Sequence, residues 1–289
     1  MTTGSGGVLK RPVLLVHGQP GLGADWAAVT ARLGPGADVL APDRPGYGTG
    51  GPATSMAANA DALADLLRRH GGPPAVVVGH SYGGGIAVLL AARHPALVAG
   101  LVLVASVGAE GSVVALDRVL ALPVVGTGAS VAALVTSSWL GPRLRRHLLS
   151  LQFGPAQVMS RYFPDDGMVA AARDRSAWRS FVVEQRALVA ELPAVRGAVD
   201  RLALPVAVVT GTRDAVVPAR ASARLAAAIG GAELVLVPGA GHFLLTDAPG
   251  VVARAVERVS ARAGKPTSRR PSQRRRLASD GEDGLTADR

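Results

Sequence analysis

A serine in a glycine-rich pentapeptide is the residue of this sequence with the clearest potential for covalent chemistry. Ser81 lies in the run Gly79–Gly83, which reads GHSYG, between a predicted buried strand and a predicted helix. A tight turn from strand to helix requires small neighbours, and it exposes the serine hydroxyl at a helix N-terminus, where developing negative charge is favoured. The pattern predicts that Ser81 is a nucleophile for acyl transfer.

A serine hydroxyl is a weak nucleophile, so the chain must also supply a base and a group that orients the base. His242 follows the last predicted strand, and Asp214 follows the predicted strand before it. The carboxyl ends of parallel strands meet at one edge of a sheet, so both side chains are expected near Ser81. We therefore predict His242 as the base and Asp214 as its orienter, with Glu110 as the alternative acid.

Two backbone N–H groups are predicted to stabilise the oxyanion that such an attack creates. One belongs to Tyr82, the residue after the predicted nucleophile. The other belongs to Gln19, in the loop His17–Gly21 after the first predicted strand, because Pro20 has no N–H to donate. Losing one such donor typically costs about 2.7–4 kcal/mol of barrier.

The elements that must position these residues follow from apolar runs that alternate with longer amphipathic segments. Strands are predicted at 12–16, 39–41, 75–78, 98–105, 205–210 and 233–237, and helices at 25–33, 55–70, 81–93, 219–229 and 248–262. Continuous apolar strands that alternate with helices are typical of a parallel sheet covered on both faces. The predicted fold class is therefore α/β, with a mostly parallel, doubly wound sheet.

The alternation stops between residues 107 and 200, where the pattern is helical. This predicts one core domain, formed by 8–106 and 201–263, with 107–200 inserted as a helical cap. Residues 119–140 carry no charged side chain, a length that could span a membrane. Because a proline, glycines and hydroxyl residues interrupt the segment, we expect a buried or pocket-lining helical pair and no stable membrane span.

The net charge and its distribution along the chain limit the classes of partner that this protein is expected to bind. Part of the net charge of +10 lies in residues 264–289, where cations are followed by acids, and this composition predicts a disordered tail. No aromatic residues are interleaved with the cations, so we predict no nucleic-acid partner, and weak contact with a membrane surface is the alternative. The partner expected at Ser81 is a small-molecule substrate. The sequence does not specify the oligomeric state.

The chain contains no cysteine, which excludes disulfides and thiolate metal ligands. The first seven residues lack the charged and apolar regions of a signal peptide, so a cytoplasmic location is predicted. No metal and no cofactor is predicted, because attack by a serine activated by a histidine and an aspartate needs neither.

Five motifs in chain order resemble those of the α/β-hydrolase superfamily: His17–Gly21, Asp43–Gly48, Gly79–Gly83, Gly211–Asp214 and Gly239–His242. The resemblance extends from about Pro12 to Arg262 and implies a serine hydrolase with a helical cap. Epoxide hydrolases and haloalkane dehalogenases of this superfamily have an aspartate at the nucleophile position, so Ser81 argues against both. Asp43 and Arg44 are similar to a structural turn of the family. The strand hairpin that usually comes first has only about ten residues before Pro12, so we expect it to be shortened or missing.

The main functional hypothesis is hydrolysis of a small or medium apolar carboxylic ester, because the predicted cap is apolar. A carbon–carbon bond hydrolase for dienoic acids would use the same residues and a cation for the carboxylate, for which the candidates are Arg143, Arg145, Arg146 and Arg161. Perhydrolase or haloperoxidase-like activity is also compatible with this site. A non-catalytic ligand-binding protein with the same fold is the alternative from another class.

Overall fold

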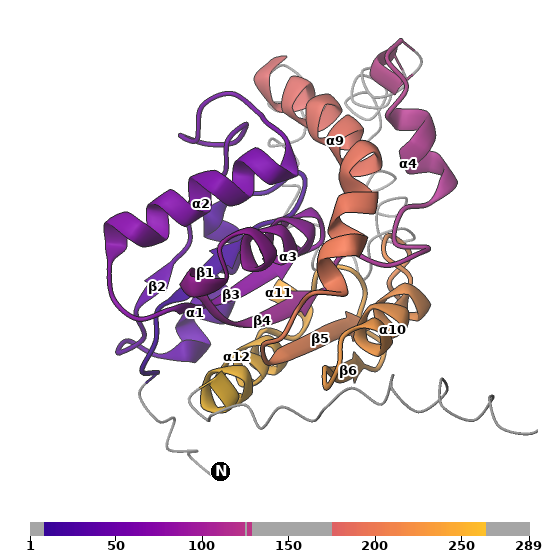
Figure 1. The fold of residues 1–289 in the computed structure, drawn as a ribbon. Coiled ribbons are helices and arrows are strands. Elements are labelled where there is room, and N and C mark those ends of the chain that lie inside the picture. The colour runs from indigo at the N-terminus through magenta and orange to yellow at the C-terminus, as the bar shows by residue number, and fades with distance from the viewer. Residues whose placement is uncertain (1–8, 125, 129–174, 264–289) are drawn as a thin grey trace, which may run out of the picture.

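A single parallel sheet forms the centre of the protein (Figure 1), which we describe from a computed structural model covering residues 9–124, 126–128 and 175–263. The strands are β1 (Val13–Val16), β2 (Val39–Leu40), β3 (Ala75–His80), β4 (Val98–Val104), β5 (Val206–Gly211) and β6 (Glu233–Val237). They are ordered β2-β1-β3-β4-β5-β6, and every neighbouring pair is parallel. The predicted α/β class with a parallel sheet is confirmed.

Helices cover both faces of the sheet. The helices are α1 (Ala27–Leu33), α2 (Met56–His70), α3 (Tyr82–Arg93), α4 (Ala115–Leu120), α9 (Arg175–Val199), α10 (Ala219–Ala228), α11 (Leu244–Asp247) and α12 (Pro249–Ala263), with 3₁₀ turns at Gly23–Trp26 and Pro95–Leu97. One face carries α2, α3, α9 and α10, and the other carries α1, α11 and α12 (Figure 1).

The central strands β1, β3, β4 and β5 are mostly apolar because both of their faces are buried. In β4, Leu101 and Leu103 pack toward α3, and Val102 and Val104 pack toward α12. Successive side chains of a strand point to opposite faces, so a central strand between two helical layers needs an apolar residue at every position. Helix α2 begins where expected: the Ser55 hydroxyl accepts a hydrogen bond from the Ala58 N–H at 3.1 Å.

The order of the strands reverses between β1 and β3. The chain goes from β1 outward to β2, then returns to place β3 on the other side of β1. Loops at the carboxyl ends of two such strands diverge and leave a crevice, which is where open α/β sheets bind their ligands. Val16 lies opposite Gly79, so the loop after β1 begins beside the turn that carries Ser81.

Helices α4 and α9 belong to the segment between β4 and β5, as the predicted interruption of the sheet requires. The carboxyl-terminal half of α9 joins the core: Leu188, Val195 and Val199 are buried in the same cluster as α3. The boundaries predicted for the core, the cap and the tail stay predictions, and most of the cap and all of the tail lie outside the described residues.

The expected burial of the charge-free segment does not hold in its described part. Val119, Leu122 and Val124 are exposed, and Val124 keeps 83% of its surface. Val119 lies in the short helix α4, whose main described contact is with α9, and Leu122 and Val124 follow the end of that helix. None of the helices in the described ranges combines the length and the hydropathy that a membrane span requires.

Candidate active site

Ser81 occupies a strained turn between β3 and α3. Its φ of 54° and ψ of −120° lie outside the regions that side-chain-bearing residues usually adopt. The neighbouring backbone imposes this conformation: the Ser81 N–H donates to the Val104 carbonyl at 2.9 Å, and the Ser81 carbonyl accepts from the Gly84 N–H at 2.9 Å. The serine is thus held at the carboxyl end of β3 and at the N-terminus of a helix.

The glycines around Ser81 are required by close backbone approaches. A Cβ atom at Gly79 would overlap the Gly83 carbonyl, and a Cβ atom at Gly83 would overlap the carbonyls of Val16 and His17. Helix α3 therefore starts directly against the end of β1. This is the small-neighbour requirement expected from the GHSYG run.

The structure brings together His242 and Asp214, which follow β6 and β5. His242 Nδ1 lies 2.9 Å from Asp214 Oδ2, and both side chains are almost fully buried. The other carboxylate oxygen, Oδ1, accepts hydrogen bonds from the N–H groups of Val216 at 2.9 Å and Val217 at 2.8 Å. The carboxylate is thus fixed on one side and directs its free oxygen at the imidazole.

His80 connects this pair to the turn that carries Ser81. Its Nε2 lies 3.0 Å from the His242 carbonyl, and the two imidazole rings are 4.8 Å apart between centroids. Since a carbonyl only accepts, Nε2 of His80 carries the proton. Burial, with a further contribution from His242, lowers the pKa of His80 to about 3, so this ring is neutral at pH 7. His80 was not predicted to have this linking role.

The loop after β1 lies against the same turn. A Cβ atom at Gly18 would lie 3.2 Å from Ser81 Cβ and 2.9 Å from His80 Nδ1, so only glycine fits between them. The side chain of Gln19 is directed at α9, where its Nε2 donates to the Phe181 carbonyl at 2.8 Å. Tyr82 is the first residue of α3, so its N–H has no carbonyl within the helix to which it could donate.

The family resemblance implied that Asp43 and Arg44 form a structural turn. Asp43 accepts a hydrogen bond from the Gly23 N–H at 2.9 Å, in agreement with that interpretation. Arg44 is fully buried and pairs with Glu184 on α9, a contact that the sequence did not reveal. In the sequence, Glu184 is visible only as a glutamate in an apolar stretch of the segment predicted to be helical. This pattern does not indicate which residue would pair with it.

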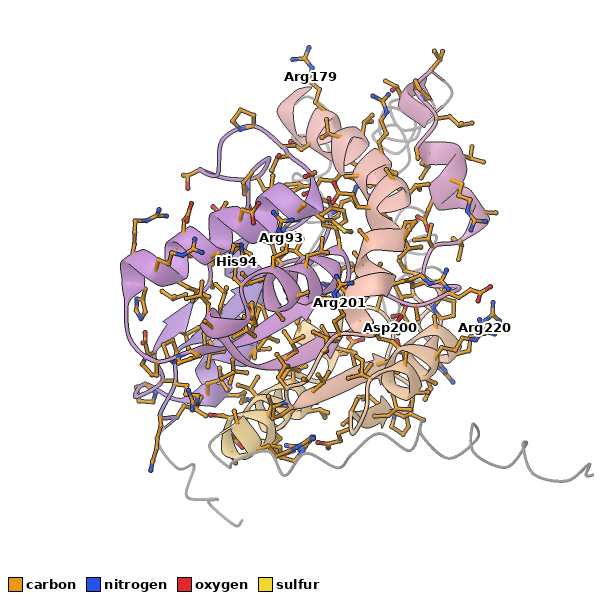
Figure 2. All side chains as sticks on the ribbon, viewed as in Figure 1. Arg93, His94, Arg179, Asp200, Arg201 and Arg220 are labelled. Carbon is orange, nitrogen blue, oxygen red and sulfur yellow. The ribbon has the colours of Figure 1, made fainter. Side chains whose placement is uncertain are left out.

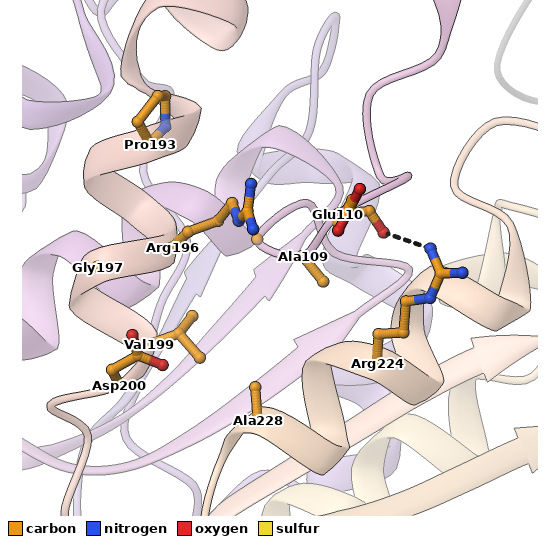
Figure 3. Close-up of a pocket in the computed structure, with 10 residues that line it drawn as sticks. Ala109, Glu110, Pro193, Arg196, Gly197, Val199, Asp200, Arg224 and Ala228 are labelled. Carbon is orange, nitrogen blue, oxygen red and sulfur yellow. Dashed lines mark hydrogen bonds between the residues drawn. The ribbon is translucent and has the colours of Figure 1, made fainter.

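Glu110, the alternative acid, lies elsewhere (Figure 3). Its carbonyl accepts a hydrogen bond from Arg224 at 3.3 Å, at the mouth of a surface pocket of about 430 Å³ between α9 and α10. The residues that line this pocket include none of Ser81, Asp214 and His242. The carboxylate in contact with His242 is that of Asp214.

The remaining described histidines form surface or loop contacts. His94, at the end of α3, lies 2.8 Å from Asp61, which also pairs with Arg93 at 2.7 Å (Figure 2). His70 lies 2.8 Å from Asp38. His147 and the four arginines considered for carboxylate binding lie outside the described residues. Within the described ranges, no group of three or more His, Cys, Asp or Glu side chains could hold a metal ion.

Comparison with known proteins agrees with this architecture. The family model described as alpha/beta hydrolase fold matches residues 11–249. A pimeloyl-[acyl-carrier protein] methyl ester esterase of Chromobacterium violaceum is 32% identical over 244 residues, which cover 80% of this chain and 86% of the esterase. An uncharacterized protein of Mycobacterium tuberculosis is 29% identical over 255 residues, covering 85% of this chain and 74% of that protein.

A solved structure shares the fold at lower sequence identity. The 2-hydroxy-6-oxo-6-phenylhexa-2,4-dienoate hydrolase of Rhodococcus sp. strain RHA1 superposes with a TM-score of 0.69 and 22% identity, over 85% of this chain and 88% of that chain. The family match extends over all six strands of the described sheet and includes every motif on which the resemblance was based. The chain therefore belongs to the α/β-hydrolase-fold family, as the resemblance implied.

Proposed function

We propose that the protein is a serine hydrolase that cleaves a small or medium carboxylic ester through an acyl-enzyme on Ser81. The observation that carries the proposal is the buried hydrogen bond between His242 and Asp214, at the sheet edge where Ser81 sits in its strained turn. A buried histidine held by a fixed carboxylate, next to a serine at a helix N-terminus, is an arrangement that activates the serine. An ester as substrate is supported by the relative that is named a methyl ester esterase.

The first step forms the acyl-enzyme. With Nδ1 of His242 donating to Asp214, Nε2 carries the lone pair of the neutral ring and accepts the proton of the Ser81 hydroxyl. The Ser81 oxygen attacks the ester carbonyl, and the carbonyl oxygen becomes an oxyanion. The imidazolium then gives its proton to the leaving alkoxide, which departs as the alcohol as the carbon–oxygen bond breaks.

The oxyanion is stabilised by two N–H groups, those of Gln19 and Tyr82. Tyr82 supplies the first N–H of α3, where the helix dipole also favours negative charge. Gln19 supplies an N–H from the loop that packs against Ser81. In the second step His242 removes a proton from water, the hydroxide attacks the acyl-enzyme, and Ser81 regains its proton as the carboxylic acid leaves.

No metal and no organic cofactor takes part in these steps, and the substrate is the expected partner. The cytoplasmic location predicted from the sequence is retained as part of the proposal.

The proposal is tested with a fluorophosphonate probe, which reacts with activated serines. The wild-type protein should be labelled, and Ser81→Ala should not be. Ser260→Ala is the matched control, because it makes the same change in α12, a helix that carries none of the three proposed catalytic residues, and it should be labelled like the wild type. A folded wild-type protein that takes up no label would refute the nucleophile and favour a non-catalytic binding protein.

The substrate class is tested with aryl esters of increasing acyl chain length. Turnover that depends on Ser81 is the expected result. If Ser81 is labelled but no ester is turned over, the ester is the wrong substrate. A dienoic acid substrate for carbon–carbon cleavage, or peroxide as the acceptor, is then tried on the same variants.

A further inference from the structure

The ion pair between Arg44 and Glu184 joins two parts of the molecule that lie far apart in sequence. Arg44 follows β2 and Glu184 belongs to α9, and both side chains have no solvent-exposed surface. Arg44 Nη1 and Nη2 both donate to the carboxylate, and the hydroxyl of Tyr47 donates to Glu184 Oε2 at 2.8 Å. Asn59 Oδ1 accepts a further hydrogen bond from Arg44 Nη1 at 3.3 Å. Each end of the pair is thus held by additional partners.

The rest of the guanidinium holds the loop after β1. Arg44 Nε donates to the His17 carbonyl at 3.0 Å, and Nη2 donates to the Gly18 carbonyl at 2.8 Å. The Arg44 N–H donates to His17 Nε2 at 3.0 Å, so the ring proton of the neutral His17 is on Nδ1. That Nδ1 lies 2.9 Å from the same Gly18 carbonyl. The Gly18 carbonyl is therefore held by two donors.

Holding this carbonyl sets the direction of the Gln19 N–H, because both belong to one peptide unit. The bond between Gly18 and Gln19 is trans, so its carbonyl and its N–H point in opposite directions. The N–H consequently points away from Arg44 and His17. In the described part of the structure no group accepts a hydrogen bond from it. The same loop packs against Ser81 Cβ at Gly18.

We infer that Arg44 and Glu184 are positioning residues, which aim the Gln19 N–H at the oxyanion formed on Ser81. The inference rests on the proposed function. Glu184 holds the guanidinium, the guanidinium holds the Gly18 carbonyl, and the peptide unit transmits that orientation to the N–H. The Gln19 side chain, bonded to the Phe181 carbonyl, gives the loop a second attachment to α9. Helix α9 thereby contributes to catalysis through the loop after β1.

The double variant that removes both charged side chains of the pair is expected to fold. Apolar side chains of similar size often replace a buried ion pair without loss of stability, whereas removal of one partner leaves the other charge unpaired. The double variant Arg44→Met/Glu184→Leu removes both charges together, and with them the Arg44 Nη2 donor to the Gly18 carbonyl, so that only His17 Nδ1 still holds this carbonyl. Its matched control is Arg93→Met/Asp61→Leu, which makes a similar change in a surface pair whose side chains are 47% and 44% exposed.

The test compares kcat, KM and the Ki of an aryl trifluoromethyl ketone, which forms an oxyanion on the serine. Because transition-state analogues report stabilisation that the ground state lacks, the double variant should show a Ki raised about 10- to 100-fold, with kcat lowered by a similar factor and KM changed little. The surface control should leave all three constants unchanged. A folded double variant with wild-type Ki and kcat overturns the inference.

A second variant keeps the test decisive if the double variant does not fold. Arg44→Lys keeps a positive charge beside Glu184, but an ammonium cannot reach two carbonyls and a carboxylate in the planar geometry of a guanidinium. It should raise Ki and lower kcat in the same proportion, and a Ki equal to that of the wild type would overturn the inference. If the wild-type protein neither takes up fluorophosphonate nor binds the ketone, it is the proposed function that fails.

Discussion

Two buried pairs of oppositely charged or polar side chains lie near Ser81, and they are built differently. His242 and Asp214 are 28 residues apart and extend from the ends of adjacent strands. Arg44 and Glu184 are 140 residues apart and join a loop to a helix of the inserted segment. In both pairs, other donors hold the carboxylate: two backbone N–H groups at Asp214 and the Tyr47 hydroxyl at Glu184.

The two pairs differ in whether the nitrogen-containing side chain can still accept a proton. A neutral imidazole that donates from Nδ1 retains a lone pair on Nε2, so it can accept a proton. A guanidinium stays protonated and has no acceptor, and Arg44 uses its donors on two carbonyls, an amide and a carboxylate. The first pair is suited to moving a proton, and the second is suited to holding a loop. The following predictions test this contrast, from the largest expected effect to the smallest.

Asp214→Asn should lower kcat about 10³- to 10⁴-fold with little change in stability. The amide can donate to Nδ1, which favours the tautomer with its proton on Nε2, and that tautomer cannot accept the Ser81 proton. Steady-state kinetics with an aryl ester measure the effect. Asp247→Asn is the control, because Asp247 accepts a hydrogen bond from the Gly241 N–H at 3.3 Å, whereas the carboxylate hydrogen-bonded to His242 is that of Asp214. Equal losses in the two variants would contradict the role of Asp214.

A further buried histidine lies beside each pair, His80 next to His242 and His17 next to Arg44, and both should make the fold sensitive to acid. Burial lowers the pKa of His17 and of His80 from 6.5 to about 3. Between these values the two histidines bind more protons in the unfolded chain than in the folded one, so their contribution to the free energy of unfolding falls as pH falls from 6.5 toward 3. The slope should approach about 1.4 kcal/mol per pH unit for each histidine.

Urea unfolding at a series of pH values measures this slope. The slope for His80→Asn should be smaller than that of the wild type by up to about 1.4 kcal/mol per pH unit, since the contribution of His80 is lost and the other groups are unchanged. A His80→Asn slope equal to that of the wild type would mean that burial does not lower the pKa of His80 in the folded protein.

Gly18→Ala should lower kcat by about two orders of magnitude and destabilise the fold by about 1–3 kcal/mol. The added Cβ would meet His80 Nδ1 at 2.9 Å and Ser81 Cβ at 3.2 Å, so the loop must move away from the nucleophile. Gly36→Ala is the control, because nothing lies within 4 Å of a Cβ at that position. Unchanged kinetics for Gly18→Ala would show that the loop does not need its close approach to Ser81.

Tyr47→Phe should have the smallest effect on catalysis. It removes the hydroxyl that donates to Glu184 at 2.8 Å, which should cost about 1.5–3 kcal/mol of stability. Arg44 keeps its contacts with the loop, so kcat should change less than about threefold. Tyr82→Phe is the control. The Tyr82 hydroxyl is buried without a hydrogen-bond partner in the described part of the structure, so its loss should not lower the free energy of unfolding.

Much of the local structure could be predicted because it depends on neighbours in sequence. The strand Glu233–Val237 has the predicted bounds, and the helix predicted at 55–70 begins after its Ser55 cap. The region 25–33 was predicted as one helix, but it starts as a 3₁₀ turn at Gly23–Trp26. The short helix Leu244–Asp247 was not predicted, since a single turn has no detectable period.

The features of the candidate site also fall into those that depend on neighbours in sequence and those that depend on tertiary contacts. The sequence by itself determined the turn around Ser81 and the places of Asp214 and His242, because glycine spacing and the ends of parallel strands encode these positions locally. Only the tertiary structure decided that His80 links Ser81 to His242 and that Arg44 pairs with Glu184. Such contacts depend on how a loop and a distant helix pack against each other, and no periodicity along the chain records the partner that a buried charge will meet.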